Sequence, residues 1–288
     1  MLMIRSKRYR MFRVAVVVVA ALVAGMVGTR LAAADEPLRY VALGDSSAAG
    51  PGIPNQINAA CGRSDRNWPH VLATILRAEL TDVTCSGARI PDLSGRQYGS
   101  IAPQFDALGP DTDLVTLAIG GNDIAGSEAF VACATLTPEP TGPTCQERFT
   151  VGGVDQYATR VAETAPVLAA ALKEIKRRSP QAAVAVVGYL TYWQPGGCFP
   201  ADPYVPVDAD YLQATFDRLM AMLADQAAAH GATYVDIRTP SADHGLCAPP
   251  AKRWLEGAIP AVPALKYHPN ATGMANAAKI IAAAVPQR

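Results

Sequence analysis

Short apolar runs rich in β-branched residues alternate with longer stretches of helical periodicity, and this alternation limits the fold more than any other feature of the chain. A strand, a helix and another strand in succession are typical of a parallel sheet covered by helices on both faces. We therefore predict an α/β fold with a five-stranded parallel sheet. The strands are expected near residues 40–43, 83–85, 114–119, 184–190 and 233–237.

Apolar residues between the later strands recur at steps of three and four, which marks one buried face of a helix. The helix before the fourth strand has its apolar face at Val161, Ala165, Leu168, Leu172 and Ile175. The helix before the fifth strand has its apolar face at Leu212, Phe216, Leu219 and Leu223. A last helix is predicted over residues 271–284, with Asn270 as its N-cap. Because function in such sheets lies beyond the carboxyl ends of the strands, the residues after each strand are the first candidates.

The first 34 residues differ from the rest of the chain and predict a signal peptide. A basic opening precedes an apolar run over residues 14–28, and Ala32, Ala33 and Ala34 fit the small residues before a cleavage site. We expect cleavage near Ala34, a mature domain over residues 35–288, and a secreted, extracellular protein with no stable membrane anchor. The alternative is an uncleaved membrane anchor. A spanning helix needs about 20 apolar residues, whereas the apolar run over residues 14–28 has 15.

Charge and length exclude some classes of partner. Residues 1–34 hold six Lys and Arg and no acid, so the whole-chain balance of 25 basic against 25 acidic residues becomes 19 against 25, a net charge of −6. A mildly acidic domain without a basic cluster is not suited to nucleic acid or to anionic membranes. The mature length fits a single domain, and we expect a monomer.

Six cysteines follow the predicted signal peptide, and an even number in an exported chain indicates three disulfides. The sequence alone allows about 15 pairings. A zinc site is the alternative, but the chain has no Cys-x-x-Cys pair. The cysteines are Cys61, Cys85, Cys133, Cys145, Cys198 and Cys247.

A tight turn of glycine and small residues follows the first strand, from Gly44 through Asp45 and Ser46 to Gly50. Such a turn lets a serine hydroxyl stand clear of bulky neighbours, as a nucleophile requires. The simpler alternative is an ordinary turn in which Asp45 caps the next helix. Ser46 is thus a candidate nucleophile that needs support from other loops.

Two more loops offer hydrogen-bond donors at the same edge of the sheet. Gly87 follows the second strand and Asn122 follows the third. Donors aimed at a developing oxyanion commonly make the largest contribution to the catalysis of ester cleavage. The alternatives are a glycine needed for positive φ and a local Asx turn.

An imidazole reaches this edge as well, because His268 lies between the fifth strand and the last helix. The other histidines fit simpler interpretations: His70 falls within an amphipathic helix, His230 at a helix end, and His244 in a loop near a cysteine. His268 is therefore the candidate general base.

The four motifs, in this order and spacing, resemble those of the SGNH hydrolases, also called the GDSL esterase and lipase family. The six cysteines and the Gly-Asp-Ser-x-x-x-Gly opening are most similar to the secreted actinobacterial branch. The resemblance extends from about residue 40 to the last helix and implies a three-layer α/β/α sandwich akin to flavodoxin. It also implies consecutive disulfides, Cys61 with Cys85, Cys133 with Cys145, and Cys198 with Cys247.

The resemblance assigns a role to each motif. Ser46 would be the nucleophile and His268 the general base, then acid. The N–H groups of Ser46 and Gly87 and the side-chain amide of Asn122 would form the oxyanion hole. Acyl transfer by this arrangement needs neither a metal nor a cofactor.

One position departs from the family pattern. Many members carry an Asp three residues before the histidine, and Leu265 stands there in this chain. That carboxylate normally orients the imidazole. We predict instead that the Leu265 carbonyl accepts from His268 Nδ1–H, which leaves a Ser-His dyad; the alternative is another acid, Asp236 or Asp243.

The substrate is expected to be a small-molecule or lipid ester. A short or medium acyl chain is favoured, followed by lipid or phospholipid esters and then carbohydrate acetyl esters. Residues 125–153 form an insertion that would shape the acyl pocket, and the candidate wall residues are Tyr98, Phe130, Trp193 and Trp254. Two other classes are a catalytically degenerate lipid- or carbohydrate-binding protein and a phosphate cradle of the flavodoxin kind.

Overall fold

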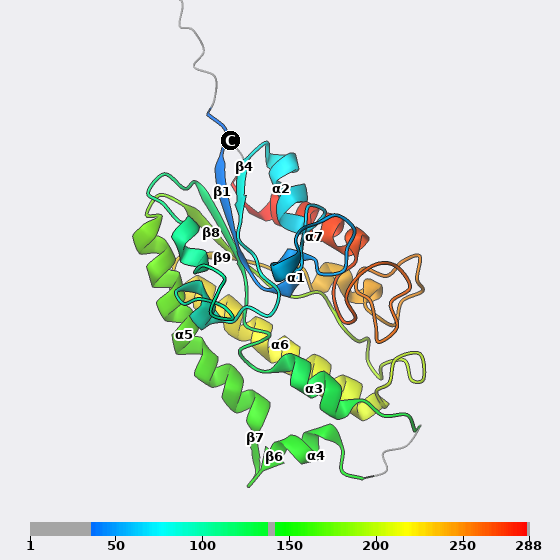
Figure 1. Cartoon of the computed structure of the whole chain (residues 1–288). Helices are drawn as coiled ribbons and strands as arrows, with labels where there is room; N and C mark the ends of the chain where they lie inside the picture. The colour runs from blue at the N-terminus through cyan, green and yellow to red at the C-terminus, as the bar shows by residue number, and fades with distance from the viewer. Residues whose placement is uncertain (1–35, 138–141, 287–288) are drawn as a thin grey trace, which may run out of the picture. The chain divides into compact units, whose positions relative to one another are not determined.

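The computed structural model describes residues 36–137 and 142–286, whose arrangement Figure 1 shows. The chain divides after Glu36, and the helices and strands labelled in the figure belong to the unit that begins at Pro37. The predicted signal peptide over residues 1–34, with its cleavage near Ala34, lies outside the described residues. Across the two described ranges, every helix is too short or too polar to span a bilayer.

Five parallel strands form the central sheet, in the order β4-β1-β5-β8-β9. β1 pairs with the central strand β5, from Tyr40 with Leu114 to Gly44 with Ala118. Every residue of β5 is buried, as expected for a parallel strand covered on both faces. The bounds of the strands are β1 Arg39–Gly44, β4 Glu79–Asp82, β5 Leu114–Ala118, β8 Ala183–Val187 and β9 Thr233–Val235.

The second strand was predicted in the wrong position. β4 ends at Asp82, whereas the prediction covered residues 83–85. The N–H of Val83 still donates to the Ala42 carbonyl at 3.1 Å, and that of Cys85 to the Gly44 carbonyl at 3.0 Å, so pairing with β1 continues past β4. β4 is an edge strand in which exposed and half-buried residues alternate, so it contains polar residues. A prediction based on apolar runs therefore does not detect it.

Helices cover both faces of the sheet (Figure 1). α2 (Trp68–Leu76) packs against α7 (Ala271–Ala284) on one face, and α5 (Gln156–Arg178) packs against α6 (Pro206–Ala229) on the other. The predicted apolar faces fall in α5 and α6, and Asn270 caps α7. The three-layer α/β/α prediction is therefore confirmed.

Shorter elements lie in the loops, where they are too brief to show a periodic pattern in the sequence. They are α1 (Ser46–Ala49), α3 (Gly126–Cys133) and α4 (Cys145–Phe149), the hairpins β2 (Gln56–Asn58) with β3 (Arg63–Ser64) and β6 (Thr150–Val151) with β7 (Val154–Asp155), and 3-10 turns at Ala59–Cys61, Ile90–Leu93, Gln104–Ala107 and Thr239–His244.

Three disulfides fasten these loops, and their pairing agrees with the one that the family resemblance implied. They join Cys61 to Cys85, Cys133 to Cys145, and Cys198 to Cys247.

Candidate active site

Ser46 and His268 meet at the carboxyl edge of the sheet, although 222 positions separate them in the chain. His268 Nε2 lies 2.7 Å from Ser46 Oγ. Ser46 is the first residue of α1, just after β1, and His268 lies in the loop before α7. A neutral imidazole at this distance is able to accept the hydroxyl proton.

The turn before Ser46 depends on a close approach between β1 and β5. Gly44 has a φ of +151°, and a Cβ on it would lie 2.5 Å from the Ala118 carbonyl oxygen, so only glycine fits. The buried side chain of Gln104 then accepts from Gly44 N–H at 2.8 Å and donates to the Gly44 carbonyl at 2.9 Å. These contacts fix where the serine turn begins.

Asp45 is buried beside Ser46 and caps α1. Its Oδ1 accepts from Ser47 N–H at 2.8 Å and from the Ser47 hydroxyl at 2.7 Å, and its Oδ2 accepts from the Tyr189 hydroxyl at 2.6 Å. Burial raises the pKa of Asp45, and these hydrogen bonds oppose the rise. The Tyr189 hydroxyl also accepts from Gly121 N–H at 2.8 Å, which links the serine turn to the loop after β5.

A main-chain carbonyl orients the ring of His268, but the prediction of Leu265 is wrong. His268 Nδ1 lies 2.8 Å from the Lys266 carbonyl oxygen, whereas the Leu265 carbonyl accepts from the backbone N–H of His268 at 3.2 Å. The physical reason is Tyr267, whose φ of +61° makes a left-handed turn. That turn uses the Leu265 carbonyl to close itself and leaves the next carbonyl for the ring.

No carboxylate takes this place in the described part of the chain. Asp236 accepts instead from the N–H groups of Arg238 and Thr239, at 2.9 and 3.1 Å. Burial lowers the pKa of His268, and the Lys266 carbonyl opposes this change. The imidazole is therefore held in its neutral form, with its Nδ1–H donating to a neutral acceptor.

Glu256 holds the loop that carries His268 through both its main chain and its side chain. It is fully buried, and its N–H donates to the His268 carbonyl at 3.0 Å while its own carbonyl accepts from Tyr267 N–H at 2.9 Å. Its carboxylate accepts from Asn270 Nδ2 at 2.7 Å and pairs with Arg253 at 3.4 Å. The same residue thus fixes the histidine loop and the start of α7.

The predicted oxyanion donors lie on the loops after β1, β4 and β5. Within residues 36–137 and 142–286, the N–H groups of Ser46 and Gly87 have no hydrogen-bond acceptor. Asn122 Nδ2 donates one hydrogen to the Ala88 carbonyl at 3.0 Å, which leaves its second hydrogen for another acceptor. Asn122 and Ser46 line the same cavity.

A carboxylate joins the loops that carry Gly87 and Asn122. Ile90 N–H donates to the two oxygens of Asp123 at 3.0 and 3.3 Å. Burial raises the pKa of Asp123 to about 6, the charge of Asp45 adds to the rise, and the Ile90 N–H opposes it. Sequence patterns gave no sign of this contact.

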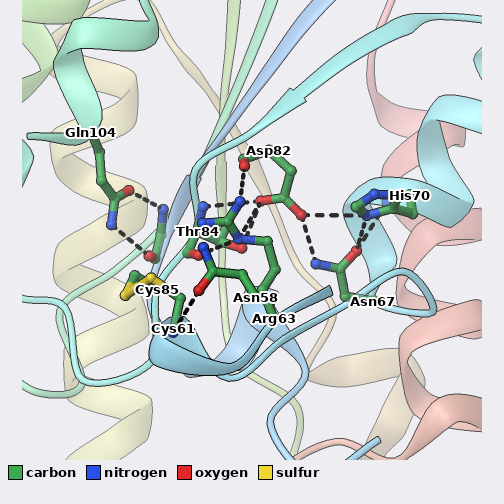
Figure 2. Close-up of polar contacts among 10 residues, drawn as sticks. Asn58, Cys61, Arg63, Asn67, His70, Asp82, Thr84, Cys85 and Gln104 are labelled. Atoms are coloured by element: carbon green, nitrogen blue, oxygen red, sulfur yellow. Dashed lines mark hydrogen bonds and ion pairs between the residues drawn. A yellow bond between two sulfur atoms is a disulfide. The ribbon is translucent and has the colours of Figure 1, made fainter. Parts of the chain in front are cut away.

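The loop after β4 is also braced from the side of the β2-β3 hairpin (Figure 2). The disulfide between Cys61 and Cys85 crosses this boundary. Arg63 Nε donates to the Thr84 carbonyl at 2.8 Å, and Arg63 also bonds the Asp82 carbonyl. The Asp82 carboxylate accepts from Thr84 N–H at 2.9 Å. Residues 82–85 are therefore held by the β2-β3 hairpin in addition to their main-chain bonds to β1.

A cavity of about 410 Å³ opens beside Ser46 and His268. Its size falls within the usual range of ligand pockets, and its apolar lining suits an aliphatic chain. The insertion over residues 125–153 supplies part of the wall through α3, as expected. The aromatic lining residues are Phe130, Tyr189, Tyr192, Tyr204, Phe216 and Tyr267.

Only one of the four predicted wall residues lines this cavity. That residue is Phe130, and Trp193 is buried behind it with ring centroids 5.3 Å apart. Trp254 stacks on His244 with centroids 4.1 Å apart, and Tyr98 contacts the loop after β4. Trp193, Trp254 and Tyr98 are therefore not cavity residues.

One of the missed lining residues was within reach of the sequence argument. Tyr189 and Tyr192 directly follow β8, at the same edge as the motifs. The rule that residues after each strand come first would have found Tyr192, whereas Tyr189 falls inside the strand predicted over residues 184–190 and follows it only because β8 ends at Val187. Tyr204 and Phe216 gave no such signal, because they lie in a loop and on a helix face.

His268 is the histidine among the cavity-lining residues, and the other three do not line the cavity. His70 lies in α2 with its Nδ1 2.8 Å from Asn67 Oδ1 and 3.4 Å from Asp82 Oδ2. His230 is the C-cap of α6, and His244 is the residue stacked on Trp254. The described residues hold no group of three or more His, Cys, Asp or Glu side chains suited to a metal ion.

Known proteins resemble the chain over most of its length. Residues 42–275 match the GDSL-like Lipase/Acylhydrolase family. Lipase 2 from Streptomyces coelicolor is 40% identical over 251 residues, which are 84% of each chain. The lipase of Streptomyces rimosus is 32% identical over 237 residues, which are 81% of each chain.

Solved structures agree with this assignment. Phospholipase A1 from Streptomyces albidoflavus has a TM-score of 0.73 and 25% identity, covering 87% of this chain and all of that one. An extracellular lipase of Streptomyces rimosus has a TM-score of 0.72 and 27% identity, covering 86% of this chain and all of that one. This chain therefore belongs to the GDSL-like lipase/acylhydrolase family and is a carboxylic ester hydrolase with the SGNH fold.

Proposed function

We propose that the protein is a secreted serine ester hydrolase in which Ser46 is the nucleophile and His268 is the general base. The observation that carries the proposal is the 2.7 Å separation of Ser46 Oγ and His268 Nε2. Because His268 Nδ1–H donates to the Lys266 carbonyl, the lone pair of Nε2 faces the hydroxyl. The catalytic unit is a Ser-His dyad oriented by a neutral acceptor.

Acylation begins when His268 takes the Ser46 proton as Oγ bonds to the ester carbonyl carbon. The carbonyl electron pair moves to its oxygen, and this oxyanion accepts from Ser46 N–H, Gly87 N–H and the Asn122 amide. When the intermediate collapses, the alcohol leaves with the proton held by His268. Water then attacks the acyl-enzyme with the same assistance and releases the acid.

The acyl group of the substrate is proposed to occupy the aromatic cavity beside Ser46. Each buried CH₂ group contributes about 0.8 kcal/mol, so affinity rises with chain length until the cavity is full. We propose a short or medium acyl chain, which a cavity of about 410 Å³ accommodates. The names lipase and phospholipase A1 among the relatives support esters of lipids, ahead of carbohydrate acetyl esters.

Secretion is supported by the three disulfides and by the similarity to an extracellular lipase. The proposed mature protein begins at Asp35, after Ala34. N-terminal sequencing of the exported protein tests this boundary, and retention of residues 1–34 on a membrane would contradict it.

The dyad is tested with a fluorophosphonate probe and p-nitrophenyl esters of increasing chain length. Wild type should be labelled and should hydrolyse the esters, and Ser46→Ala should abolish both. Ser47→Ala is the matched control, because the Ser47 hydroxyl bonds Asp45 rather than the imidazole. A Ser46→Ala protein that keeps wild-type turnover would overturn the proposal, and an unlabelled wild type would favour a binding protein.

A further inference from the structure

The Ser86-Gly87 peptide group contains the donor that the proposed mechanism needs. This peptide bond is trans, so the Ser86 carbonyl and the Gly87 N–H point in opposite directions from one rigid plane. Whatever holds the Ser86 carbonyl therefore also aims the Gly87 N–H. That N–H has no acceptor within the described residues, as expected of a group reserved for a ligand.

Two side chains from the next turn hold the Ser86 carbonyl. Gln97 Nε2 donates to it at 2.8 Å, and the Tyr98 hydroxyl does so at 3.4 Å. Donors on a carbonyl polarise the amide, so its N–H becomes a stronger donor to a third group. Gln97 is only 2% exposed, and water therefore does not compete for its hydrogen bond.

The Gln97 side chain is not explained by its contribution to packing. Its Oε1 is the single buried side-chain nitrogen or oxygen without a hydrogen-bond partner across the described ranges. A buried unpaired acceptor destabilises a fold, and an apolar side chain of the same size would avoid that penalty. The amide is thus present for its donor, which reaches only the Ser86 carbonyl.

The turn that presents Gln97 also shapes the space around Gly87. Tyr98 and Gly99 have φ values of +52° and +74°, and this turn places the Tyr98 hydroxyl 2.2 Å from where a Cβ of residue 87 would stand. Gly87 itself has a φ of +79°. The positive φ favours glycine there, whereas the Tyr98 hydroxyl is the end of an exposed side chain that can move aside.

We propose that Gln97 is a positioning residue for catalysis, which fixes the Ser86-Gly87 peptide so that the Gly87 N–H faces the oxyanion. The inference rests on the proposed role of Gly87 as an oxyanion donor. It predicts that Gln97 acts on the transition state and not on the bound ester, because the charge on the carbonyl oxygen develops only during the reaction.

The test compares Gln97→Met, which keeps the size and removes the donor, with wild type. Enzyme is counted by fluorophosphonate titration, so that kcat refers to reactive Ser46 only. We expect kcat on p-nitrophenyl butyrate to fall about 10- to 100-fold with little change in KM. The inhibition constant of an alkyl boronic acid, which forms a tetrahedral adduct, should rise by the same factor.

Two further variants separate positioning from folding. Tyr40→Phe removes a buried hydrogen bond to Thr116 at the opposite end of β1 and should lower stability without changing kcat per titrated site. Gln97→Leu also lacks a donor and carries no charge, so it replaces Gln97→Met if that protein does not fold. Wild-type kcat and boronate affinity in a folded Gln97 variant would overturn the inference, while loss of activity in Ser46→Ala would still support the dyad.

Discussion

Replacing Tyr189 with Phe removes a single hydroxyl that joins two loops of the active site. This hydroxyl donates to Asp45 Oδ2 at 2.6 Å and accepts from Gly121 N–H at 2.8 Å. The Asp45 carboxylate is buried, with 2% of the residue exposed, whereas Gly121 is half-buried and lines the cavity beside Tyr189. The substitution therefore leaves one buried carboxylate oxygen without its partner and one N–H that water in the cavity can reach.

The size of the effect follows from these two losses. A hydrogen bond to a charged group contributes about 1.5–3 kcal/mol, and a hydrogen bond between neutral groups about 0.5–1.5 kcal/mol. We therefore expect Tyr189→Phe to lower the free energy of unfolding by about 2–4.5 kcal/mol at neutral pH. For a domain of this length, that corresponds to a melting temperature lower by roughly 10 °C.

The loss should depend on pH with a definite sign. Burial raises the pKa of Asp45 above the ordinary value of 3.8, and the Tyr189 bond opposes the rise, so the variant has a still higher folded-state pKa. At a pH low enough to protonate Asp45 in both wild type and Tyr189→Phe, the Tyr189 hydroxyl no longer bonds a charged carboxylate. The charge of Asp45 then makes no contribution to the difference in stability. The difference in stability therefore grows as pH rises through the two folded-state pKa values, which lie above 3.8.

Denaturation by guanidinium, followed by tryptophan fluorescence between pH 4 and 8, measures this difference. The matched control is Tyr40→Phe, whose hydroxyl is equally buried but bonds the neutral hydroxyl of Thr116 at 2.8 Å. It should cost about 1–2 kcal/mol at every pH. A Tyr189→Phe cost as small as the control and flat with pH would refute the reasoning.

Three further outcomes are expected. Asn122→Ala should lower kcat about 10²–10³-fold in ester hydrolysis, and unchanged turnover would remove Asn122 from the oxyanion hole. Because burial lowers the pKa of His268, kcat/KM should fall with decreasing pH only below the ordinary value of 6.5, and an acid limb centred above it would contradict the neutral, desolvated base. Phe130→Ala should cost about 3–5 kcal/mol of stability and shift preference among p-nitrophenyl esters toward longer chains, since Phe130 lines the cavity; an unchanged chain-length profile would place the acyl group elsewhere.

The loops of the site could be predicted because parallel strands bring their carboxyl ends to one edge. Ser46 follows β1, Asn122 follows β5, and His268 precedes the capped start of α7, so local patterns were enough to locate all three. The disulfide pairing needed the family resemblance in addition, because spacing alone leaves about 15 choices.

The side chains that hold those loops could not be predicted, because none belongs to a motif. Gln97 bonds a main-chain carbonyl, Tyr189 bonds the Asp45 carboxylate, and Glu256 accepts from the Asn270 amide, and only the fold brings these groups near. The error at Leu265 has a similar origin: which carbonyl meets the ring depends on the positive φ of Tyr267. A glycine in the sequence would have indicated a positive φ, whereas a tyrosine does not, because this conformation is uncommon for tyrosine.

The neutral acceptor behind His268 also changes what the rest of the site must supply. A carboxylate would stabilise the imidazolium with a full charge, whereas the Lys266 carbonyl offers only a dipole to a ring whose burial already disfavours protonation. Because the imidazolium is stabilised less, the activation barrier of ester cleavage depends more on how well the oxyanion is stabilised. The contacts that tie the donor loops together, through Gln97, Asp123 and Tyr189, fall on that side. The proposed dyad therefore needs oxyanion donors that are rigid before the substrate arrives, because donors that must reorganise as charge develops stabilise the oxyanion less.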